Sequence, residues 1–458
     1  MELKYIYDNY KKLTDQKISI IARIRSNRQG KTVSFMVLND GTYMDDLQVV
    51  YKPEILGYED AKQARISSIV EITGILTLTP SRPQPFEIQA SEIQLLDQAI
   101  EEYPLQKKEH SSEFLREISH LRARTRTFQA IFKVRSTAAY AIHKFFQEEK
   151  NFTYVTTPII TSNDAEGAGE EFIVTTTESK LNKDYVDDFF AKKANLTVSG
   201  QLNGEAFAQA FKNIYTFGPT FRAENSNTSK HAAEFWMIEP EVAFADINHN
   251  INLMKDMLVY VVKYLLDHNV KELTFLESQL ESGLIKKITK MVNADFKVNT
   301  YEEVLKLLQQ AIDNGHKFEE NKIFFGLDLG TEHERYICEI VNKCPTFVTN
   351  YPKEIKSFYM KVNNDNKTVA AVDLLVPGIG ELIGGSERES NYETLILRCK
   401  ESGINPEDLE WYNNLRQYGF YKSAGFGLGF ERLIMYVTGA ANIRDVIPFP
   451  RTPKTLLY

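Results

Sequence analysis

Five short segments rich in β-branched residues follow one another within the first hundred residues, and they limit this part of the chain to a small all-β unit. The segments cover residues 18–24, 33–38, 47–51, 68–74 and 86–90. Asn39-Asp40-Gly41, between the second and third segments, is typical of a hairpin turn. Five such strands within about eighty residues predict a closed barrel of the OB type.

The remainder of the chain predicts a second, larger domain of mixed structure. Residues 101–125 are polar, with a short helical run near their end, and this composition suits a hinge or linker. Apolar residues at helical spacing over 125–149 predict a long amphipathic helix. Because strands and helices then alternate irregularly, we expect an α+β protein with domains at 1–100 and 126–458, joined by a linker at 101–125.

Composition excludes several classes of protein. Of the 458 residues, 43% are hydrophobic and 25% charged, which excludes a disordered chain and a collagen. The three cysteines are too few for a disulfide scaffold, and no paired cysteines indicate a structural zinc site. The N-terminus does not resemble a signal peptide and no apolar run is long enough to cross a membrane, so we expect a soluble, cytoplasmic protein without a membrane partner. The net charge of −8 disfavours nucleic acid as a partner, although one basic face can coexist with an acidic remainder.

A polar loop between two predicted strands carries the first candidate binding residues. Between a strand at 214–218 and another at 235–238 lie Arg222, Glu224, Lys230 and His231. Arginine can hold a phosphate or a carboxylate through two parallel hydrogen bonds, and lysine and histidine add positive charge. Taken alone, the loop is more often a solvated hairpin tip than a binding site.

Two further segments mark possible sites. Gly425, Gly427 and Gly429 alternate along a predicted strand that runs into an apolar helix with Arg432 at its start. Glycines at alternate positions let a ligand or another backbone approach closely, but the spacing is not that of a dinucleotide site. Earlier, residues 151–160 are predicted as a helix end followed by a strand that contains Pro158, which indicates a sheet edge or an interface.

In chain order, residues 151–160, the loop with Arg222 and the glycine-containing strand at Gly425 resemble motifs 1, 2 and 3 of the class II aminoacyl-tRNA synthetases. Further segments resemble the asparaginyl-tRNA synthetases of the aspartyl/asparaginyl subclass: residues 199–203, 234–241, 351–356, 373–378, 384–389 and 443–451. The resemblance covers nearly the whole chain. It implies an OB-fold anticodon-binding domain followed by a catalytic domain built on the antiparallel sheet of class II synthetases. The implied reaction is ATP-dependent ligation of L-asparagine to tRNA(Asn) through an asparaginyl-adenylate, in cytoplasmic translation.

The resemblance also implies roles for individual residues around ATP. Arg222 would bridge the amino acid carboxylate and the α-phosphate, and His231 would contact the outer phosphates. Glu224 would face the adenine, with Phe235 stacked on one face of the ring and Arg432 on the other face or at the γ-phosphate. Mg²⁺ would accompany ATP, and the carboxylates that would hold it are Glu381 and Asp373.

For the amino acid, the resemblance implies a pocket that separates an amide from a carboxylate. Arg388 would donate to the side-chain carbonyl oxygen, and Glu239 would accept from the amide nitrogen. The remaining implied contacts are Glu166 to the α-ammonium, with Ser199 and Gln201 on the floor of the pocket. Gly204 stands where the aspartyl enzymes carry a lysine, which removes the cation that a second charged oxygen would need.

The resemblance implies two partners besides the small substrates. In the barrel, Arg28, Phe35 and Gln48 match contacts to the anticodon, although Phe35 is also compatible with the barrel core and Arg28 with a solvated loop. A second copy of the chain would form a homodimer through the predicted strand at Pro158 and its preceding helix. The region 266–338 matches the family loosely and receives no role.

Two departures and three alternatives remain. Ser423 stands where the family usually has histidine, and Lys230 where arginine is commoner. An aspartyl-tRNA synthetase, including one that charges both tRNAs, is disfavoured by Gly204 and Glu239. A paralogue of the asparagine-synthetase kind, without tRNA charging, is disfavoured by the retained barrel. A non-catalytic OB-fold protein is disfavoured by the intact Arg222, Glu381 and Arg432.

Overall fold

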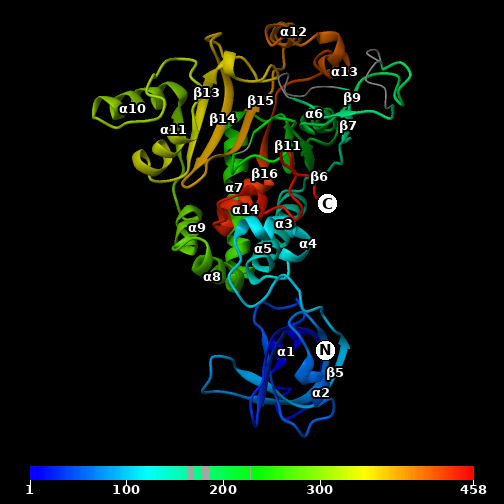
Figure 1. Ribbon diagram of the computed structural model, residues 1–458. Coiled ribbons are helices and arrows are strands. Elements are labelled where there is room, and N and C mark those ends of the chain that lie inside the picture. The colour runs from blue at the N-terminus through cyan, green and yellow to red at the C-terminus, as the bar shows by residue number, and fades with distance from the viewer. Residues whose placement is uncertain (163–169, 178–184, 227) are drawn as a thin grey trace. The chain divides into compact units, whose positions relative to one another are not determined.

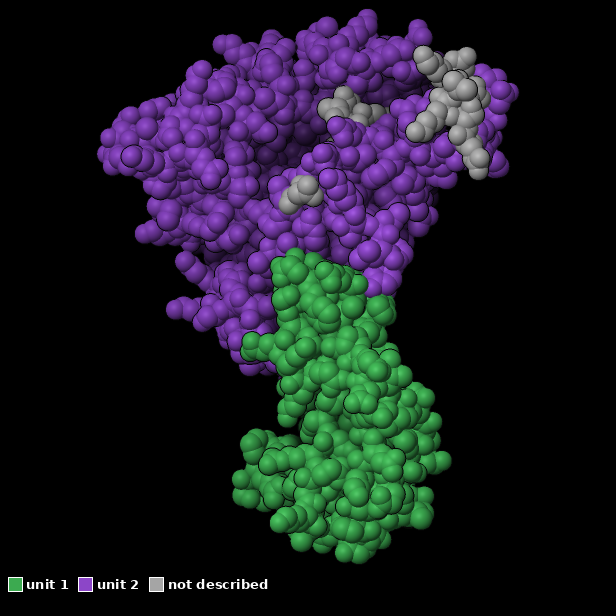
Figure 2. Space-filling view, viewed as in Figure 1, with its two compact units in different colours: residues 1–130 green, residues 131–458 purple. Residues whose placement is uncertain are grey.

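The computed structural model describes residues 1–162, 170–177, 185–226 and 228–458. The chain divides into two compact units, residues 1–130 and 131–458, which Figure 2 colours green and purple. Among the described residues, no helix is both long enough and apolar enough to span a membrane.

The first unit contains the predicted five-stranded barrel. Its strands are β1 (Lys17–Arg28), β2 (Ser34–Asn39), β3 (Leu47–Tyr51), β4 (Ile69–Leu78) and β5 (Phe86–Asp97). They close in the order β1-β2-β3-β5-β4. Alternate residues point inward, as at Ile18, Ile20 and Ile24, which are almost completely buried. The connection after Asn39 is longer than a tight hairpin, since β3 begins only at Leu47.

Four short helices complete this unit. They are α1 (Leu3–Asn9), α2 (Tyr58–Gln63), α3 (Ser112–Glu117) and α4 (Ser119–Arg122). The last two form the helical run expected in the predicted linker, and α3 begins where the Ser111 hydroxyl caps the backbone N–H of Phe114. The linker lies within the first unit by compactness, and the boundaries at 100 and 125 stay predictions.

The second unit is built on an eight-stranded sheet (Figure 1). In spatial order its strands are β12 (Lys297–Thr300), β13 (Thr346–Pro352), β14 (Thr368–Val376), β15 (Gly380–Glu387), β16 (Ser423–Gly429), β11 (Glu234–Ala243), β10 (Asn213–Phe221) and β6 (Thr153–Tyr154). The neighbours pair antiparallel except at the two ends, where β12 and β6 run parallel to their partners. The predicted antiparallel sheet is therefore confirmed.

Helices cover both faces of this sheet. The predicted long helix is α5 (Arg126–Lys144), which continues as one π-helical turn, η1 (Phe145–Glu149). The other helices are α6 (Gln201–Phe211), α7 (Ile247–His268), α8 (Val270–Gln279), α9 (Leu284–Val292), α10 (Tyr301–Asp313), α11 (Thr331–Arg335) with η2 (Tyr336–Val341), α12 (Tyr392–Glu401), α13 (Glu410–Asn413) and α14 (Phe430–Thr438). Short 3₁₀ turns lie at η3 (Lys353–Ile355), η4 (Pro406–Leu409), η5 (Asn414–Gln417) and η6 (Ile443–Asp445).

Two of these helices lie on opposite faces of the central strands. Asn250 of α7 donates to the carbonyl of Gly425 at 2.8 Å, and a Cβ added at Gly385 would collide with Met254 of the same helix. On the other face, a Cβ added at Gly204 of α6 would lie 3.3 Å from Ile214 in β10. The open part of this second face holds the candidate site.

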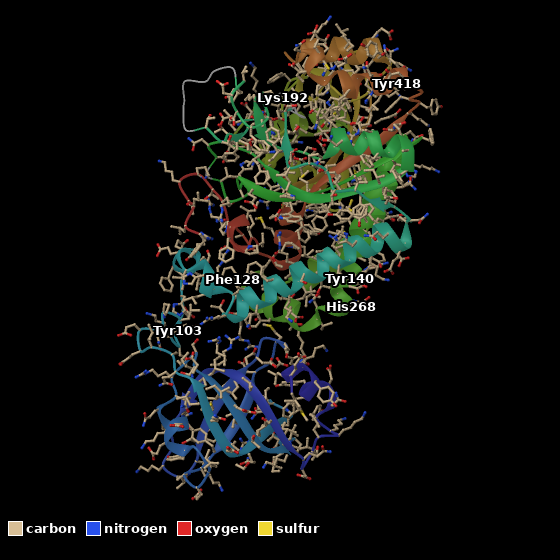
Figure 3. All side chains as sticks on the ribbon, turned by 90° about the vertical axis from the view of Figure 1, so that its right-hand side faces the viewer. Tyr103, Phe128, Tyr140, Lys192, His268 and Tyr418 are labelled. Carbon is tan, nitrogen blue, oxygen red and sulfur yellow. The ribbon has the colours of Figure 1, made fainter. Side chains whose placement is uncertain are left out.

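Aromatic rings connect α5 with α7. The ring centroids of Tyr140 and Tyr264 lie 6.0 Å apart, and Tyr264 stacks on His268 at 3.9 Å; Tyr140 and His268 are labelled in Figure 3. These ring contacts pack α5 against α7.

The prediction of a strand that contains Pro158 is wrong. Strand β6 ends at Tyr154 and β7 (Ile160–Thr161) begins after the proline, so Pro158 lies in the extended segment between them. A proline has no N–H to donate to a ladder, which explains why pairing is interrupted there. Strand β7 joins a separate small sheet with β9 (Ala194–Leu196) and β8 (Ile173–Val174).

Candidate active site

One face of the sheet carries the polar residues of the site. In β11 alternate side chains point to the same face, which places Phe235, Met237, Glu239 and Glu241 in one row. Neighbouring strands add glycines to this row, because Gly425 pairs with Glu241. A Cβ at Gly425 would collide with the Glu241 carboxyl group, so the glycine makes room for a buried acid beside the strand.

The six residues predicted to contact ATP line one pocket. They come from the loop between β10 and β11, from β11 and β15, and from α14: Arg222, Glu224, His231, Phe235, Glu381 and Arg432. The guanidinium of Arg222 lies 5.5 Å from the centroid of the Phe235 ring. Arg432 lies 3.5 Å from a carboxylate oxygen of Glu381. Segments more than two hundred residues apart in sequence therefore meet in a single cavity with two arginines and an aromatic ring.

Two more basic groups of this pocket have perturbed titration. Partial burial, and next the charge of Arg432, lower the pKa of Lys230, whose ammonium donates to the carbonyl of Ile379 at 2.7 Å. The same two causes lower the pKa of His231. The imidazole of His231 therefore contributes less positive charge near neutral pH than the sequence suggested, and most of the positive charge of the pocket comes from its arginines.

Two predicted metal ligands converge beside the pocket. A Cβ at Gly384 would lie 2.9 Å from Oε1 of Glu381 and 3.2 Å from Oδ1 of Asp373, so both carboxylates reach over a position that has no side chain. Lys356 donates to Asp373 at 2.7 Å, and burial raises the pKa of this aspartate. The described residues contain no cluster of three or more metal-binding side chains. A pair of carboxylates nevertheless suits Mg²⁺, which keeps several water ligands and binds substrate phosphates.

Glu334 of α11 also belongs to this region, although the sequence assigned it no role. Its carboxylate accepts from the backbone N–H of Glu381 at 3.0 Å. Burial, and next the charge of Glu381, raise its pKa to about 7. Sequence reasoning missed Glu334 because it lies in the region 266–338, which matches the family only loosely.

Arg388 lies buried at the other end of the row. Its guanidinium donates to both carboxylate oxygens of Glu241, through Nε at 3.1 Å and through Nη2, and to the Ser386 hydroxyl at 2.8 Å. Both oxygens of Glu241 thus accept from a group that can only donate, which is the pattern of an ionised carboxylate. Burial works in the opposite direction and raises the pKa of Glu241.

The acid nearest to Arg388 is therefore Glu241 and not Glu239. Glu239 accepts hydrogen bonds from the Ser199 hydroxyl, from the backbone N–H of Gly200 and from the Thr216 hydroxyl, the last two at 3.0 Å. These partners are neutral. Glu239 is consequently a buried carboxylate that accepts hydrogen bonds from uncharged groups of β10 and of the segment just before α6.

The remaining predicted residues of this pocket are placed as follows. Gln201 donates to Glu205 at 3.1 Å, so its amide faces the charged cluster. Glu166 lies outside the described residues. At Gly204 a Cβ would lie 3.3 Å from Cδ1 of Ile214 and 3.6 Å from Cγ of Glu241, so this position packs closely against the sheet and leaves little room for a side chain. Ser423 is completely buried, and its hydroxyl has no hydrogen-bond partner in the described structure.

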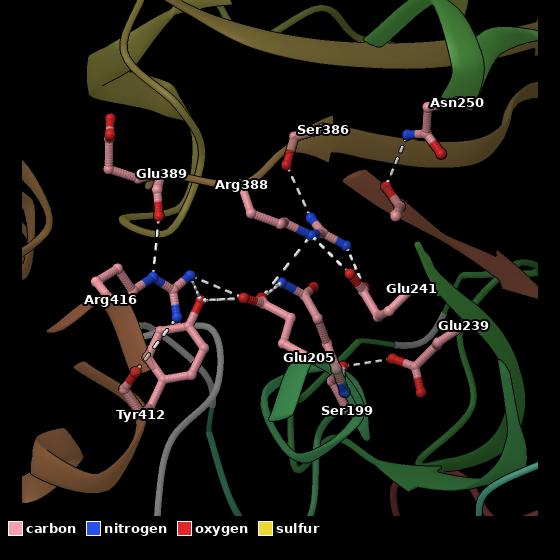
Figure 4. Close-up of polar contacts among 12 residues, drawn as sticks. Ser199, Glu205, Glu239, Glu241, Asn250, Ser386, Arg388, Glu389, Tyr412 and Arg416 are labelled. Atoms are coloured by element: carbon pink, nitrogen blue, oxygen red, sulfur yellow. Dashed lines mark hydrogen bonds and ion pairs between the residues drawn. The ribbon is translucent and has the colours of Figure 1, made fainter. Parts of the chain in front are cut away.

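Three buried residues of this cluster were missed by sequence reasoning: Glu205, Tyr412 and Arg416 (Figure 4). For Glu205 a signal existed, because it lies on the buried stripe of α6 between Leu202 and Ala208, at a spacing of three. A carboxylate at such a position needs buried partners. Tyr412 and Arg416 lie in irregular short helices and had no comparable signal.

The three predicted anticodon residues lie on the outer surface of the barrel. Phe35 pairs with Arg28 across β2 and β1, and its neighbour Met36 takes the inward position. Phe35 is therefore not a barrel-core residue. On β3 the Gln48 side chain donates to Glu87 of β5 at 2.9 Å. Arg28 is exposed beside them, so the surface combines an aromatic face with hydrogen-bonding groups.

Comparison with known proteins agrees with this geometry. Residues 111–453 match the family described as tRNA synthetases class II (D, K and N), and residues 18–96 match the OB-fold nucleic acid binding domain. The chain is 77% identical to an asparagine--tRNA ligase of Mesoplasma florum over the full length of both proteins. It is 52% identical to the asparagine--tRNA ligase of a Clostridium botulinum strain, over 99% of this chain and 98% of the relative.

A solved structure gives the same result for the fold. The asparaginyl-tRNA synthetase of Pyrococcus horikoshii, complexed with asparaginyl-adenylate, is 31% identical and superposes with a TM-score of 0.86 over 97% of each chain. The chain therefore belongs to the class II tRNA synthetases of the D, K and N group, and within it to the asparagine–tRNA ligase family.

Proposed function

We propose that the protein ligates L-asparagine to tRNA(Asn) at the expense of ATP, through an asparaginyl-adenylate, in cytoplasmic translation. The observation that carries this proposal is the single row on the sheet: a pocket with Arg222, Phe235 and Arg432 at one end and the buried Arg388 with Glu239 at the other. A nucleotide and an amino acid bound along this row would meet between the two ends.

The first step needs no protein nucleophile. The carboxylate of asparagine attacks the α-phosphorus, the bond to the β-phosphate breaks, and pyrophosphate leaves. Negative charge on the α-phosphate oxygens increases in the transition state, and the guanidinium of Arg222 stabilises it while orienting the carboxylate. Phe235 stacks on the adenine, with Glu224 at the edge of the ring and Arg432 on the opposite side. The terminal ribose hydroxyl of the tRNA then displaces AMP from the adenylate.

Mg²⁺ neutralises phosphate charge when it is bound with ATP, and Glu381 and Asp373 are the residues that would hold it. We expect Glu381→Gln to raise the Mg²⁺ concentration for half-maximal pyrophosphate exchange by about ten- to a hundredfold, because one anionic oxygen ligand is lost. A Mg²⁺ titration at saturating ATP measures this. Glu148→Gln, at an exposed position on η1, is the matched control and should leave the titration unchanged. An unchanged Mg²⁺ requirement in Glu381→Gln would contradict the assignment.

Selection of asparagine follows from the charges at the other end of the row. Arg388 donates to the side-chain carbonyl oxygen of the substrate. Glu239 accepts from the amide NH₂, and its protein partners are neutral hydroxyl and amide groups. An aspartate side chain has no N–H to donate to Glu239 and would place a second anion beside this buried carboxylate, so charge repulsion disfavours aspartate. Ser199 and Gln201 complete the floor, and Glu166 binds the α-ammonium.

The barrel reads the anticodon by stacking a base on Phe35, with Arg28 and Gln48 alongside. We expect Phe35→Ala to lower kcat/KM for tRNA aminoacylation by about tenfold or more, since a base loses its stacking surface. Pyrophosphate exchange without tRNA should be unchanged, and Phe35→Trp should retain most of the tRNA activity. An equal loss in both assays would show a folding defect and contradict the anticodon role.

Assembly as a homodimer is part of the same proposal. The helix α5 and the segment around Pro158 expose apolar side chains, among them Tyr140 at 55%, Ile159 at 43% and Ile160 at 43%. Exposed apolar groups of this size on neighbouring elements are typical of an interface. Light scattering of the purified chain measures the mass in solution.

Aminoacylation tests the proposed function as a whole. Purified protein should transfer labelled asparagine to a tRNA(Asn) transcript with ATP and Mg²⁺, and a transcript with a different anticodon should accept far less. Adenylate formation without transfer to tRNA would instead favour a paralogue that does not charge tRNA.

A further inference from the structure

A second buried pair of opposite charges, Glu205 and Arg416, lies next to the Arg388–Glu241 pair. Glu205 of α6 accepts from Nη2 of Arg416 at 2.8 Å and from the Tyr412 hydroxyl at 2.9 Å. The Glu205 and Arg416 side chains are both 0% exposed. Figure 4 shows that this pair continues into the Arg388 contacts without interruption.

Glu205 links the two pairs. Its Oε1 lies 3.8 Å from Nε of Arg388, so one carboxylate faces two guanidinium groups. Arg416 in turn donates through Nε to the carbonyl of Glu389 at 2.9 Å, the residue next to Arg388 in sequence. Rotation of the Arg388 side chain, or a shift of the backbone that carries it, would therefore break contacts made by Glu205 or Arg416.

The charges of the four side chains balance. Two guanidinium groups, Arg388 and Arg416, face two carboxylates, Glu205 and Glu241. Besides Glu205, the groups bonded to Arg416 in the described structure are neutral: the carbonyls of Glu389 and Tyr412 and the Tyr412 hydroxyl. The position before Glu205 adds no charge, because Gly204 has no side chain. The cluster thus offers no spare positive charge to a ligand.

We propose that Glu205 is a positioning and specificity-determining residue: it neutralises Arg416 and orients Arg388, so that the pocket binds a neutral carboxamide and rejects a carboxylate. This inference rests on the proposed function and extends it to a residue behind the pocket. The physical reason is that an anion entering a buried, charge-balanced cluster loses its hydration without gaining a counter-charge. Removing the charge of Glu205 leaves Arg416 as an uncompensated cation, which favours an anionic side chain.

The test is Glu205→Gln, with pyrophosphate exchange measured separately for asparagine and aspartate. The amide retains the size of the side chain and can still accept from Tyr412. We expect the ratio of kcat/KM for asparagine to that for aspartate to fall by at least about tenfold, mainly through a lower KM for aspartate. A merely structural role would lower both substrates by the same factor and leave the ratio unchanged, which would overturn the proposal.

Three further variants keep the test decisive. Glu205→Gln combined with Arg416→Gln restores the charge balance, so the ratio should return toward that of the unaltered chain. Arg416→Gln alone removes a cation and should raise the ratio, even if Glu205→Gln does not fold. Tyr412→Phe removes the hydroxyl that is bonded to Glu205 and Arg416 but removes no charge, and it should leave the ratio unchanged. A ratio that does not respond to the charge of Glu205 or Arg416 contradicts the inference.

The same assay separates this inference from the proposed function. Exchange with asparagine by the unaltered chain supports the function whatever the variants do. If the unaltered chain prefers asparagine and the ratio is the same in all variants, the inference alone is wrong. If the unaltered chain shows no asparagine-dependent exchange, both are wrong.

Discussion

Arg222→Ala is expected to lower kcat for asparagine-dependent pyrophosphate exchange by about a thousandfold or more. The guanidinium lies in the pocket with Phe235 and Arg432, and the proposed function places it between the amino acid carboxylate and the α-phosphate. Phosphoryl transfer is catalysed almost entirely by position and charge, and loss of one such arginine typically costs three to five orders of magnitude. Arg222→Lys should recover part of the activity, because it restores the charge but not the paired hydrogen bonds.

The decisive comparison is between rate and binding. Because the proposed contact strengthens in the transition state, kcat should fall much more than KM for ATP rises. Arg82→Ala removes an arginine from the barrel and is the matched control; it should leave pyrophosphate exchange unchanged. A normal kcat in Arg222→Ala would contradict the role given to this residue.

Arg388→Met is expected to abolish asparagine activation and also to destabilise the fold. Arg388 is 2% exposed and Glu241 is 0% exposed, so removal of the arginine leaves a buried carboxylate without its main partner. Breaking a buried pair in this way costs roughly 3–5 kcal/mol in the free energy of unfolding. Denaturant unfolding measures the stability, and pyrophosphate exchange measures the activity.

A double variant separates the two effects. In Arg388→Met combined with Glu241→Met, no charge is left unpaired, so stability should largely return. Activity should stay lost, because the donor to the substrate carbonyl is still absent. If the double variant regains asparagine-dependent exchange, Arg388 does not bind the substrate.

Local sequence patterns predicted the elements of the fold that depend on short-range periodicity. The barrel strands, the helix at Arg126–Lys144 and the hairpin around Arg222 and His231 are all present at the expected places. Pro158 shows the limit of such reasoning. The β-rich stretch around it predicts a strand, but the proline has no N–H to donate, so the ladder is interrupted there.

The six residues predicted to contact ATP could be named through the family resemblance, and the fold brings all six into one pocket. The partner of Arg388 could not be identified in the same way. Glu239 and Glu241 are two apart in one strand and share a face, so only the register of β16 decides which acid reaches the arginine. Glu205, Tyr412 and Arg416 meet only through tertiary packing.

The central claim is that the row on the sheet activates asparagine and rejects aspartate. Pyrophosphate exchange by the unaltered protein, with each amino acid in turn and without tRNA, tests this most directly. We predict exchange with asparagine and a kcat/KM for aspartate lower by at least about a hundredfold, because aspartate has no N–H to donate and would place a second anion beside Glu239. Equal exchange with both amino acids, or faster exchange with aspartate, would contradict it.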